Sequence, residues 1–356
     1  MTGNHRQRLI APVLIILMIA ILQATSASAS DCPPAPAPIR DLDLARYYSD
    51  KAGTEIDETK RAANSAAAAP LKSFITELAE GADRVWRTSQ PDAAAAACPL
   101  FWLAHWAKAN ALLGSMASKQ ADYERNWALA GLAISYVKLQ AFATAEQRRA
   151  IDPWLIRLAD QCRAFFDDPA RKRNNHWYWL GLGLAAVGLA TGSERHWEEA
   201  RRIMQDAAKD IQSNGTLPME LQRGKRALHY HNFSAQPLFV MTELARTKGE
   251  DWASFNDGAF HRLAGLLYNV ATCGDRFGGR ESFEAQTGTA EQEPTEERQF
   301  QKAWGAQYLK RYPESKFCMS SSGPAISADL RKRPSNFHRL GGDLGALVRA
   351  LDLNRK

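Results

Sequence analysis

Apolar residues recur at spacings of three and four through most of the chain after residue 70, with polar residues between them. Such spacing places the apolar side chains on one face of an α-helix. Turn sequences such as SNGT (213–216) and TKGED (247–251) separate the periodic segments, and no segment alternates with the period of two that marks a strand. The pattern predicts an all-α protein with helices at 70–86, 93–114, 123–142, 145–166, 176–191, 194–212, 234–248, 257–272, 295–311 and 340–353.

A long succession of helices and short turns can stack as a solenoid or curl into a toroid of helical hairpins, and both leave a concave face. One segment interrupts the rhythm. CGDRFGGRESFEAQTGTAEQEPTEE (273–297) is rich in Gly and Glu, and it predicts a long loop that is either a lid over the concave face or a mobile part of the surface. We expect a single domain over residues 30–356.

Residues 1–29 have the features of a secretory signal peptide. Arg6 and Arg8 form a short basic start, an apolar run follows at 9–22, and Ala27–Ala29 supplies the small residues of a cleavage site. The apolar run is too short for a comfortable membrane span. We therefore expect cleavage after residue 29 and release into a bacterial periplasm or the medium, with no membrane association afterwards.

The sequence contains 45 basic and 39 acidic residues, a net charge of +6. Removing residues 1–29 takes away two basic residues and no acidic one, so the remaining chain carries +4. A mildly basic protein suits an anionic partner, but ordinary solubility explains this charge equally well.

The number of cysteines is odd, which in an oxidising compartment allows up to two disulfides and one free thiol. Their spacings fit no zinc-binding pattern, so we expect no metal. Cys162 lies on an amphipathic segment beside Leu158 and Phe165, and we expect it to be a buried free thiol. The five are Cys32, Cys98, Cys162, Cys273 and Cys318.

The stretch RNNHWYWLG (173–181) combines amides, an imidazole and aromatic rings. Asn174 and Asn175 suit a helix N-terminus, where their side chains accept backbone N–H bonds. His176 then lies in the first turn, where the helix dipole disfavours its charged form. Taken alone, this stretch is explained by a helix cap followed by core packing.

A second stretch, QRGKRALHYHNF (222–233), changes that interpretation, because a solvated charge run does not need aromatics and a core segment does not tolerate arginines. Together the two stretches can neutralise a carboxylate and move a proton. Hydrolysis of a glycosidic bond requires two carboxylates, and this region contains only Glu220. The cations and aromatics of the second stretch are Arg223, Lys225, Arg226, His229, Tyr230 and His231.

These residues also carry a resemblance. NNHWYW, RGKRALHYHNF and FHRLGGDL (337–344) are similar, in order and spacing, to signature stretches of the alginate lyases of polysaccharide lyase family 5, the poly(β-D-mannuronate) lyases. AAACPLFWLAHWAKANAL (95–112) matches as well, so the likeness covers nearly the whole mature chain. It implies a secreted, metal-independent enzyme without a cofactor, folded as an incomplete α/α toroid.

The resemblance places the catalytic residues at Asn175, His176, Arg223 and Tyr230. It also suggests a disulfide between Cys32 and Cys98, which would tie the N-terminal arm to the first helical hairpins. The candidates for binding the sugar chain are Trp177, Tyr178, Arg226, His231 and Arg339.

Two of these candidates depend on how the helix is oriented. Neighbouring residues on a helix are about 100° apart, so at most one or two of residues 177–179 can stack on sugar rings, and we expect Trp177 to face the cleft. His231 either lines the cleft or satisfies backbone groups. Arg339 is expected at the cleft wall.

The chain departs from the family pattern at two places. Trp177 stands where the family usually has a small residue. The family also uses a lysine in the N-terminal arm, for which this chain offers Arg46 or Lys51, and an arginine cannot lose its proton. These differences bear on the predicted preference for mannuronate. They bear less on the predicted elimination reaction.

The chemistry of β-elimination fits the same groups. Removing the C5 proton of a uronate requires neutralisation of the C6 carboxylate, for which Asn175, Arg223 and His176 offer donors and charge. In mannuronate the C5 proton and the leaving O4 lie on the same face, so Tyr230 alone can serve as base and acid. His176 is the alternative base.

We therefore expect a monomeric polysaccharide lyase that cleaves alginate or polymannuronate to 4,5-unsaturated uronate ends, with no nucleic-acid partner. Three alternatives remain. They are a lyase of the same fold acting on polyglucuronate or another anionic exopolysaccharide, a glycoside hydrolase on an α/α toroid, and a non-catalytic periplasmic glycan-binding protein.

Overall fold

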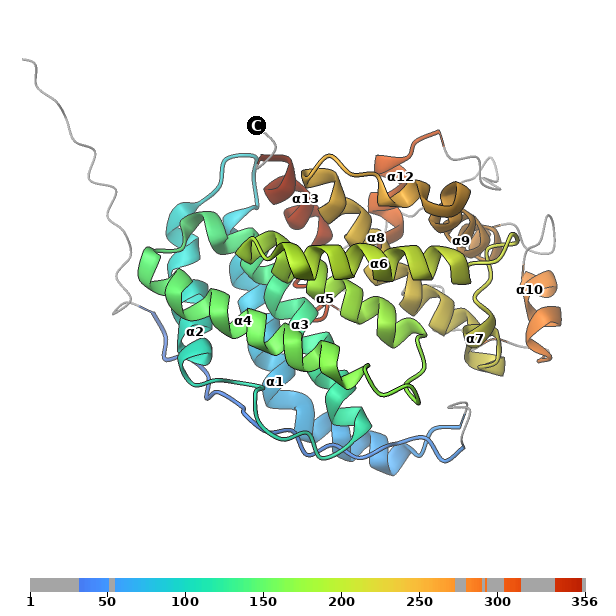
Figure 1. Cartoon of the computed structure of the whole chain (residues 1–356), viewed down its shortest axis with the longest axis horizontal. Helices are drawn as coiled ribbons and strands as arrows, with labels where there is room; N and C mark the ends of the chain where they lie inside the picture. Colours follow the sequence, from blue (N-terminus) through green and yellow to red (C-terminus); the bar gives the residue numbers. More distant parts are fainter. Residues whose placement is uncertain are drawn as a thin grey trace, which may run out of the picture.

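The computed structural model describes residues 32–50, 55–272, 280–289, 292, 304–314 and 337–353. Within these ranges the chain is helical, and its only β-type pairings are isolated bridges between Leu42 and Met116 and between Tyr48 and Ile56. The prediction of an all-α protein is confirmed (Figure 1). The signal-peptide prediction for residues 1–29 lies outside the described residues.

The α-helices are α1 (Glu58–Val85), α2 (Ala97–Lys108), α3 (Lys119–Leu139), α4 (Ala145–Phe165), α5 (Asn175–Thr191), α6 (Glu194–Asp210), α7 (Pro218–Leu221), α8 (Ala227–Thr247), α9 (Phe255–Thr272), α10 (Arg280–Thr287), α12 (Ala306–Arg311) and α13 (Leu344–Leu353). Short 3₁₀ turns are η2 (Ala93–Ala96), η3 (Gln140–Phe142), η4 (Gly224–Arg226) and η5 (Trp252–Ser254).

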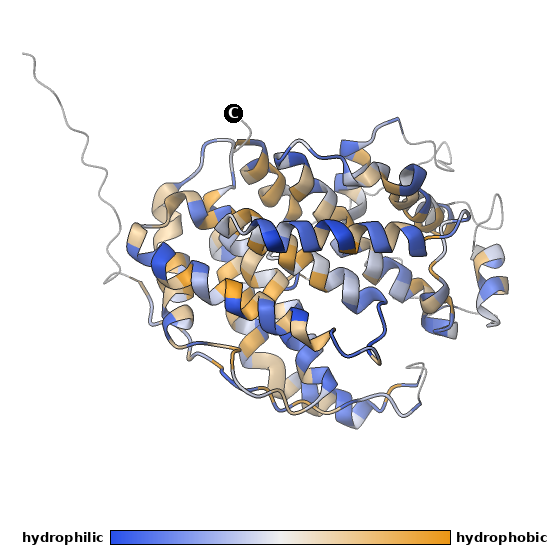
Figure 2. Ribbon diagram, in the orientation of Figure 1, coloured by the Kyte–Doolittle hydropathy of each residue, from blue (hydrophilic) through white to orange (hydrophobic). Residues whose placement is uncertain are grey.

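The helices form two layers. α1, α3, α5 and α8 pack side by side as an inner row, while α2, α4, α6 and α9 cover them from outside, α4 against α5 and α6 against both α5 and α9. This arrangement of inner and outer helices is the α/α toroid that the resemblance implies (Figure 1). α5 is buried almost throughout, whereas α6 carries hydrophilic residues along its outward side (Figure 2).

Side-chain caps determine where several helices begin. Asp57 accepts the backbone N–H of Lys60 at the start of α1, and Thr144 and Gln147 form a capping box at the start of α4. Asn174 caps α5 by accepting the N–H of His176, as its position before the apolar run predicts.

Several predicted elements are wrong in their bounds. The helix predicted at 93–114 is η2 followed by α2, which ends at Lys108, and α13 begins at Leu344 rather than at residue 340. α1 begins at Glu58, because the alanine-rich sequence before Pro70 is a strong helix former and the proline is accommodated inside the helix. α8 begins at Ala227 rather than at residue 234. The segment 273–297, predicted as a loop, contains the helix α10 at Arg280–Thr287, and most of the rest of it lies outside the described residues. Of the helix predicted at 295–311, residues 295–303 lie outside the described residues.

The N-terminal arm, residues 32–50, is fixed to the body of the protein. Cys32 and Cys98 form the disulfide that the resemblance suggests. Trp102 and Trp106 on α2 donate their indole N–H groups to the carbonyls of Pro33 and Pro36, at 2.9 and 2.8 Å. The arm therefore has a defined path, which brings its end to the site described below.

The remaining cysteines separate into two cases. Cys162 is buried and free, as predicted from its helical segment. Cys273 and Cys318 lie outside the described residues. Among the described residues there is no group of three or more His, Cys, Asp or Glu side chains placed to hold a metal ion, and no helix there has both the length and the apolar character needed to cross a membrane.

Close approach of two backbones fixes the C-terminal turn on α3. A Cβ atom at Gly131 would lie 2.1 Å from the carbonyl oxygen of His338, so a larger residue there would displace the turn. Lys138, also on α3, donates to Asp83 and to the carbonyl of Gly341. The turn that carries Arg339 is thereby held over the inner helices.

Candidate active site

The first turn of α5 is anchored by a buried carboxylate. Glu220 on α7 is 1% exposed, and its Oε1 accepts hydrogen bonds from both the backbone N–H and the side-chain amide of Asn175, each at 2.9 Å. Its Oε2 lies 3.5 Å from Nε of Arg223. Burial raises the pKa of Glu220, and the Arg223 cation and the Asn175 donors oppose that rise. Glu220 thus positions two of the predicted catalytic residues.

His176 lies flat on an aromatic ring. Its imidazole stacks on Tyr123 of α3, with ring centroids 3.6 Å apart and an angle of 3° between the planes, and the ring centroid of Trp127 lies 5.5 Å away. Burial, assisted by the Arg223 and Arg339 cations, lowers the pKa of His176 to about 3. His176 is therefore neutral near pH 7, and its Nδ1 has no hydrogen-bond partner among the described residues.

Tyr230, in the first turn of α8, faces cations from the preceding turn. The guanidinium carbon of Arg223 lies 4.3 Å from the centre of the Tyr230 ring and that of Arg226 lies 5.7 Å away. The Tyr230 hydroxyl is hydrogen-bonded to the hydroxyl of Tyr48 on the arm. Burial raises the pKa of Tyr230 above its usual value although Arg223 and Arg226 favour the phenolate, so the resting residue is a phenol.

The backbone between Arg223 and Tyr230 depends on one glycine. Gly224 has a φ of +54°, a left-handed conformation that costs glycine little. It begins the 3₁₀ turn η4, which leads directly into α8. The sequence RGKR therefore turns tightly enough to place its first arginine over the ring that follows.

The C-terminal turn completes the group from the opposite side. The guanidinium carbon of Arg339 lies 3.8 Å from the ring centre of Trp127, and its Nη2 lies 3.6 Å from Glu124. Glu124 is also 3.9 Å from the ammonium of Lys72 on α1. Arg339 therefore lies near His176 and contributes to the lowered pKa of that histidine, while its place at a cleft wall stays a prediction.

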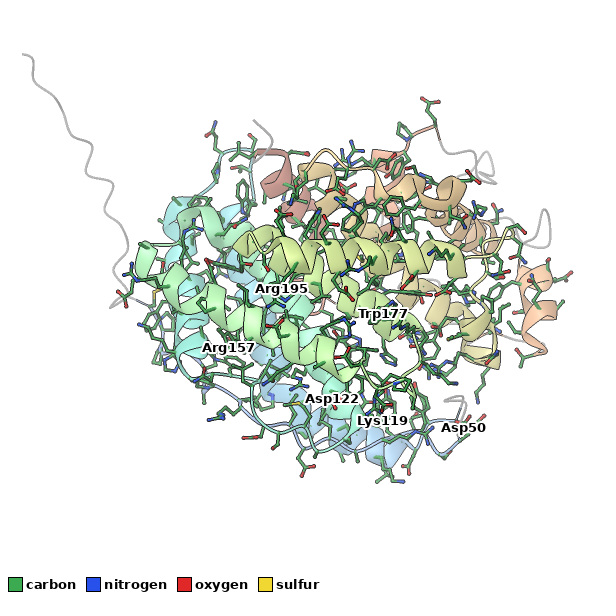
Figure 3. The ribbon with its side chains drawn as sticks, in the orientation of Figure 1. Asp50, Lys119, Asp122, Arg157, Trp177 and Arg195 are labelled. Atoms are coloured by element: carbon green, nitrogen blue, oxygen red, sulfur yellow. A yellow bond between two sulfur atoms is a disulfide. The ribbon has the colours of Figure 1, made fainter. Side chains whose placement is uncertain are left out.

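Two of the predicted sugar-binding aromatics face another way. Trp177 is buried, and its indole N–H points to Asp206 of α6 at 3.4 Å, beside Phe166. Tyr178 is buried between α5 and α6 and donates its hydroxyl to Asp210 at 2.8 Å. The rotation of about 100° per residue turns both side chains away from the face that carries His176. Figure 3 shows Trp177 at the start of α5, next to α6.

His231 serves the backbone, which is one of the two roles considered for it. The ring is fully buried, its Nε2 accepts the N–H of Leu217 at 2.9 Å, and its Nδ1 donates to the carbonyl of Ala227 at 2.8 Å. Both nitrogens are thus used within the protein. The expectation that His231 binds sugar is not supported by this placement.

Sequence reasoning missed the aromatic partners of the catalytic pair. Tyr123 and Trp127 are four residues apart on α3, and the rings of both contact His176, although Trp127 is also buried in the core. Tyr48 lies in the arm sequence ARYYSDK, and only its contact with Tyr230 reveals its role. Of the two candidates for the arm cation, Arg46 donates to the carbonyl of Asp50, and Lys51 lies outside the described residues.

Neutral His176 on α5 and buried Tyr230 on α8 lie near arginines from the adjoining turns, within an α/α toroid. The class of protein follows from the sequence comparisons and is that of the polysaccharide lyases. The sequence model of the alginate lyase family matches residues 41–277, and the chain belongs to this family. Among the described residues, no group of three or more potential metal ligands lies at this site.

Individual relatives agree with this assignment. A polysaccharide lyase of Stenotrophomonas maltophilia strain K279a is 38% identical over 338 residues, which is 94% of this chain and 95% of the relative. An alginate lyase of Azotobacter vinelandii strain DJ is 35% identical over 246 residues, 66% of this chain and 65% of the relative.

Solved structures support the fold. Alginate lyase A1-III from Sphingomonas species A1 matches with a TM-score of 0.66 at 20% identity, over 89% of this chain and 86% of that protein. A tyrosine-to-phenylalanine variant of A1-III complexed with a tetrasaccharide matches with a TM-score of 0.72 at 20% identity, over 90% and 86% of the two chains. At this identity the likeness shows the α/α toroid and nothing finer.

Proposed function

We propose that the protein cleaves mannuronate-rich alginate by β-elimination and leaves a 4,5-unsaturated uronate at the new end. The observation that carries the proposal is the grouping of Arg223 over the ring of Tyr230 with neutral His176 and Arg339 close by. Cationic donors and a proton-transferring hydroxyl are what the elimination requires. The relatives named alginate lyase support the choice of polymer.

The first task is to neutralise the C6 carboxylate, because the carbanion formed at C5 lies beside it. Arg223 supplies a full positive charge, and Asn175, fixed by Glu220, supplies amide donor capacity next to it. His176 is uncharged, since its pKa is about 3, so it contributes a hydrogen bond rather than charge. Because these groups are held by the fold, they need little reorganisation when charge develops.

Tyr230 then carries the proton from C5 to O4. In mannuronate both positions lie on one face of the ring, so a single hydroxyl can reach them. The phenolate takes the C5 proton, the C4–O4 bond breaks, and the phenol gives the proton to O4, which returns Tyr230 to the phenolate. Arg223, Arg226 and the Tyr48 hydroxyl stabilise the phenolate once it forms.

His176 remains the alternative base. Its neutral form has a lone pair at all pH values near neutrality, and Nδ1 is available. A base of such low pKa provides little driving force for removing a weakly acidic C–H proton, whereas a phenolate provides much more. The lowered pKa of His176 thus favours Tyr230 for both steps.

The substrate preference is the finer part of the proposal. The Stenotrophomonas maltophilia relative is named a polysaccharide lyase without a stated polymer, so its name does not narrow the substrate to alginate. Polyglucuronate or another anionic exopolysaccharide is the second candidate substrate. Trp177 does not determine which of these polymers is bound by stacking on a sugar at the catalytic group, because its ring is turned toward α6. We further propose that the protein works after export, consistent with residues 1–29 and with the disulfide.

The experiment mixes the purified protein, with a chelator present, with polymannuronate, polyguluronate and polyglucuronate in separate assays. The ultraviolet absorbance of the unsaturated end is followed over time. The fastest rise is expected on polymannuronate. A faster rise in absorbance on polyglucuronate would make polyglucuronate the assigned substrate instead of polymannuronate. Binding of polymer without any rise in absorbance would refute the lyase reaction.

A further inference from the structure

A pocket separate from the catalytic group opens between the end of α4, the following loop and α6. It has a volume of about 410 Å³. Trp177 forms part of its wall, and that residue follows His176 directly in the chain but points to a different side of α5. A ligand in this pocket would therefore not contact the face of α5 that carries His176.

Cations outnumber carboxylates around the pocket. Arg163 and Arg202 both bind Glu199, through Nε atoms at 2.8 and 3.0 Å from its carboxylate oxygens. Arg173 lies 3.9 Å from Asp206, and its guanidinium carbon is 4.7 Å from the ring centre of Trp177. Arg163 also binds Asp167, so three arginines share three carboxylates, two of which line the pocket.

Lys209 adds a fourth cation to the lining. It is exposed near the end of α6, and in the described part of the chain its ammonium has no hydrogen-bond or ion-pair partner. Gln205, one turn earlier on the same helix, also lines the pocket, and its amide has no hydrogen bond to a described residue. The pocket therefore offers a cation and an amide that are available to a ligand.

We propose that this pocket is a non-catalytic binding site for a uronate segment of the substrate polymer. Guanidinium and ammonium groups bind carboxylates, which a polyuronate carries on every sugar, and the amide suits sugar hydroxyls. A volume of about 410 Å³ falls in the range of sites that hold small ligands. The proposal rests on the proposed function for the chemistry of its ligand.

Such a site acts only on long chains. A polymer held at both places gains avidity, because the second contact forms at the effective concentration set by the intervening sugars. An oligosaccharide that is too short to reach beyond the catalytic group gains no avidity from the pocket. The site should therefore lower KM for polymannuronate without changing kcat, and its contribution should shrink at high salt because exposed charges are screened.

The test is a double variant, Arg202→Gln with Lys209→Gln. Both side chains are on the exposed face of α6, so the fold should be retained, which circular dichroism and the melting temperature will verify. The matched control is Arg87→Gln with Arg149→Gln, which removes two exposed cations elsewhere. KM and kcat are measured on long polymannuronate and on a tetramannuronate.

We expect the α6 double variant to raise KM on the long polymer about threefold to tenfold, which corresponds to two exposed charge contacts. Its kcat and its kinetics on the tetrasaccharide should match those of the wild type, and the control should match on both substrates. Equal KM values for the α6 variant, the control and the wild type on long polymer would overturn the pocket proposal while leaving the lyase intact.

Failure of the proposed function is recognised separately. If the wild type forms no unsaturated product from any polyuronate, the lyase proposal fails, and polymannuronate binding is then measured by calorimetry. Weaker binding by the α6 variant than by the control would still support the pocket. Equal binding by both would overturn it.

Discussion

The hydroxyl of Tyr48, on the N-terminal arm, is hydrogen-bonded to the hydroxyl of Tyr230, on α8. The arm is held by the Cys32–Cys98 disulfide and by two indole hydrogen bonds, so this contact joins a tethered segment to the residue proposed to move the proton. A hydroxyl donating to Tyr230 favours its phenolate, while burial of the ring opposes it. The arm is therefore part of the site.

Tyr230→Phe tests the central residue. The substitution removes only a hydroxyl, so kcat should fall by about 10²–10⁴-fold, the contribution typical of general acid–base catalysis, while polymer binding persists. Turnover is measured by ultraviolet absorbance and binding by calorimetry. Tyr136→Phe, which removes the hydroxyl that donates to Asp152 at 2.6 Å, is the control and should retain its rate. A Tyr230→Phe enzyme with near wild-type kcat would exclude Tyr230 as acid or base.

The pH dependence of kcat/KM distinguishes the two candidate bases. The pKa of Tyr230 is raised, so its phenolate fraction, and with it the rate, should climb roughly tenfold per pH unit as the pH rises through neutrality toward that pKa. His176, with a pKa of about 3, is already deprotonated across this range. A profile that stays level from about pH 6 to 9 would assign the base to His176 and leave only the acid role to Tyr230.

Glu220 is expected to stabilise the site rather than to react. Glu220→Ala leaves both buried donors of Asn175 without an acceptor, and the free energy of unfolding should fall by about 2–4 kcal/mol. Glu220→Gln keeps an acceptor oxygen and should cost clearly less. Urea unfolding of both variants measures the difference. Equal losses for the two would mean that the charge of Glu220, not its acceptance of these hydrogen bonds, sustains the fold.

Breaking the disulfide should affect both stability and activity. A Cys32→Ser, Cys98→Ser variant no longer closes a loop with a separation of 66 residues, and its free energy of unfolding should fall by about 2–5 kcal/mol. The kcat should fall as well, because the released arm carries Tyr48, whose hydroxyl is hydrogen-bonded to that of Tyr230. Cys162→Ala, which removes a buried free thiol, serves as the comparison and should remain sensitive to reductant. Unchanged kinetics in the double serine variant would show that fixing the arm does not contribute to catalysis.

Acid should destabilise the protein through His231. Burial lowers its pKa to about 4 from the usual 6.5, so the unfolded chain binds the proton more readily than the folded one. The stability is complete above about pH 6.5 and is lost as the pH falls toward 4, by on the order of 3 kcal/mol. A His231→Gln variant should show a smaller decline between these pH values in urea unfolding. An identical decline in the variant and the wild type would mean that groups other than His231 cause the loss of stability in acid.

The spacing of apolar residues predicted the helices well where the same residues form the packed core. The apolar period and the Asn174 cap identified α5, and the charged residues clustered in RGKRALHYHNF indicated the candidate site. The start of α8 was placed too late, because Arg226–Asn232 contains few of the apolar residues that mark the period. The polar residues that point to a site therefore hide the start of the helix from a search for apolar periodicity.

Side-chain direction could not be predicted in the same way. Trp177 and His176 are neighbours, and only the packing of α5 between α3 and α6 decides that His176 meets Tyr123 while Trp177 meets Asp206. The contact between Tyr48 and Tyr230 depends on the path of the whole arm. Such long-range contacts leave no periodic trace in the sequence.

The placement of Arg339 on the C-terminal turn makes the site depend on an intact chain. The turn is seated on α3 at Gly131, and Lys138 and Gly341, which are hydrogen-bonded there, are 203 residues apart in the sequence. A protease that cut the chain before residue 337 would leave the helices that carry His176 and Tyr230 in one fragment and Arg339 in another. Loss of the smaller fragment would then remove one of the two cations that act on His176.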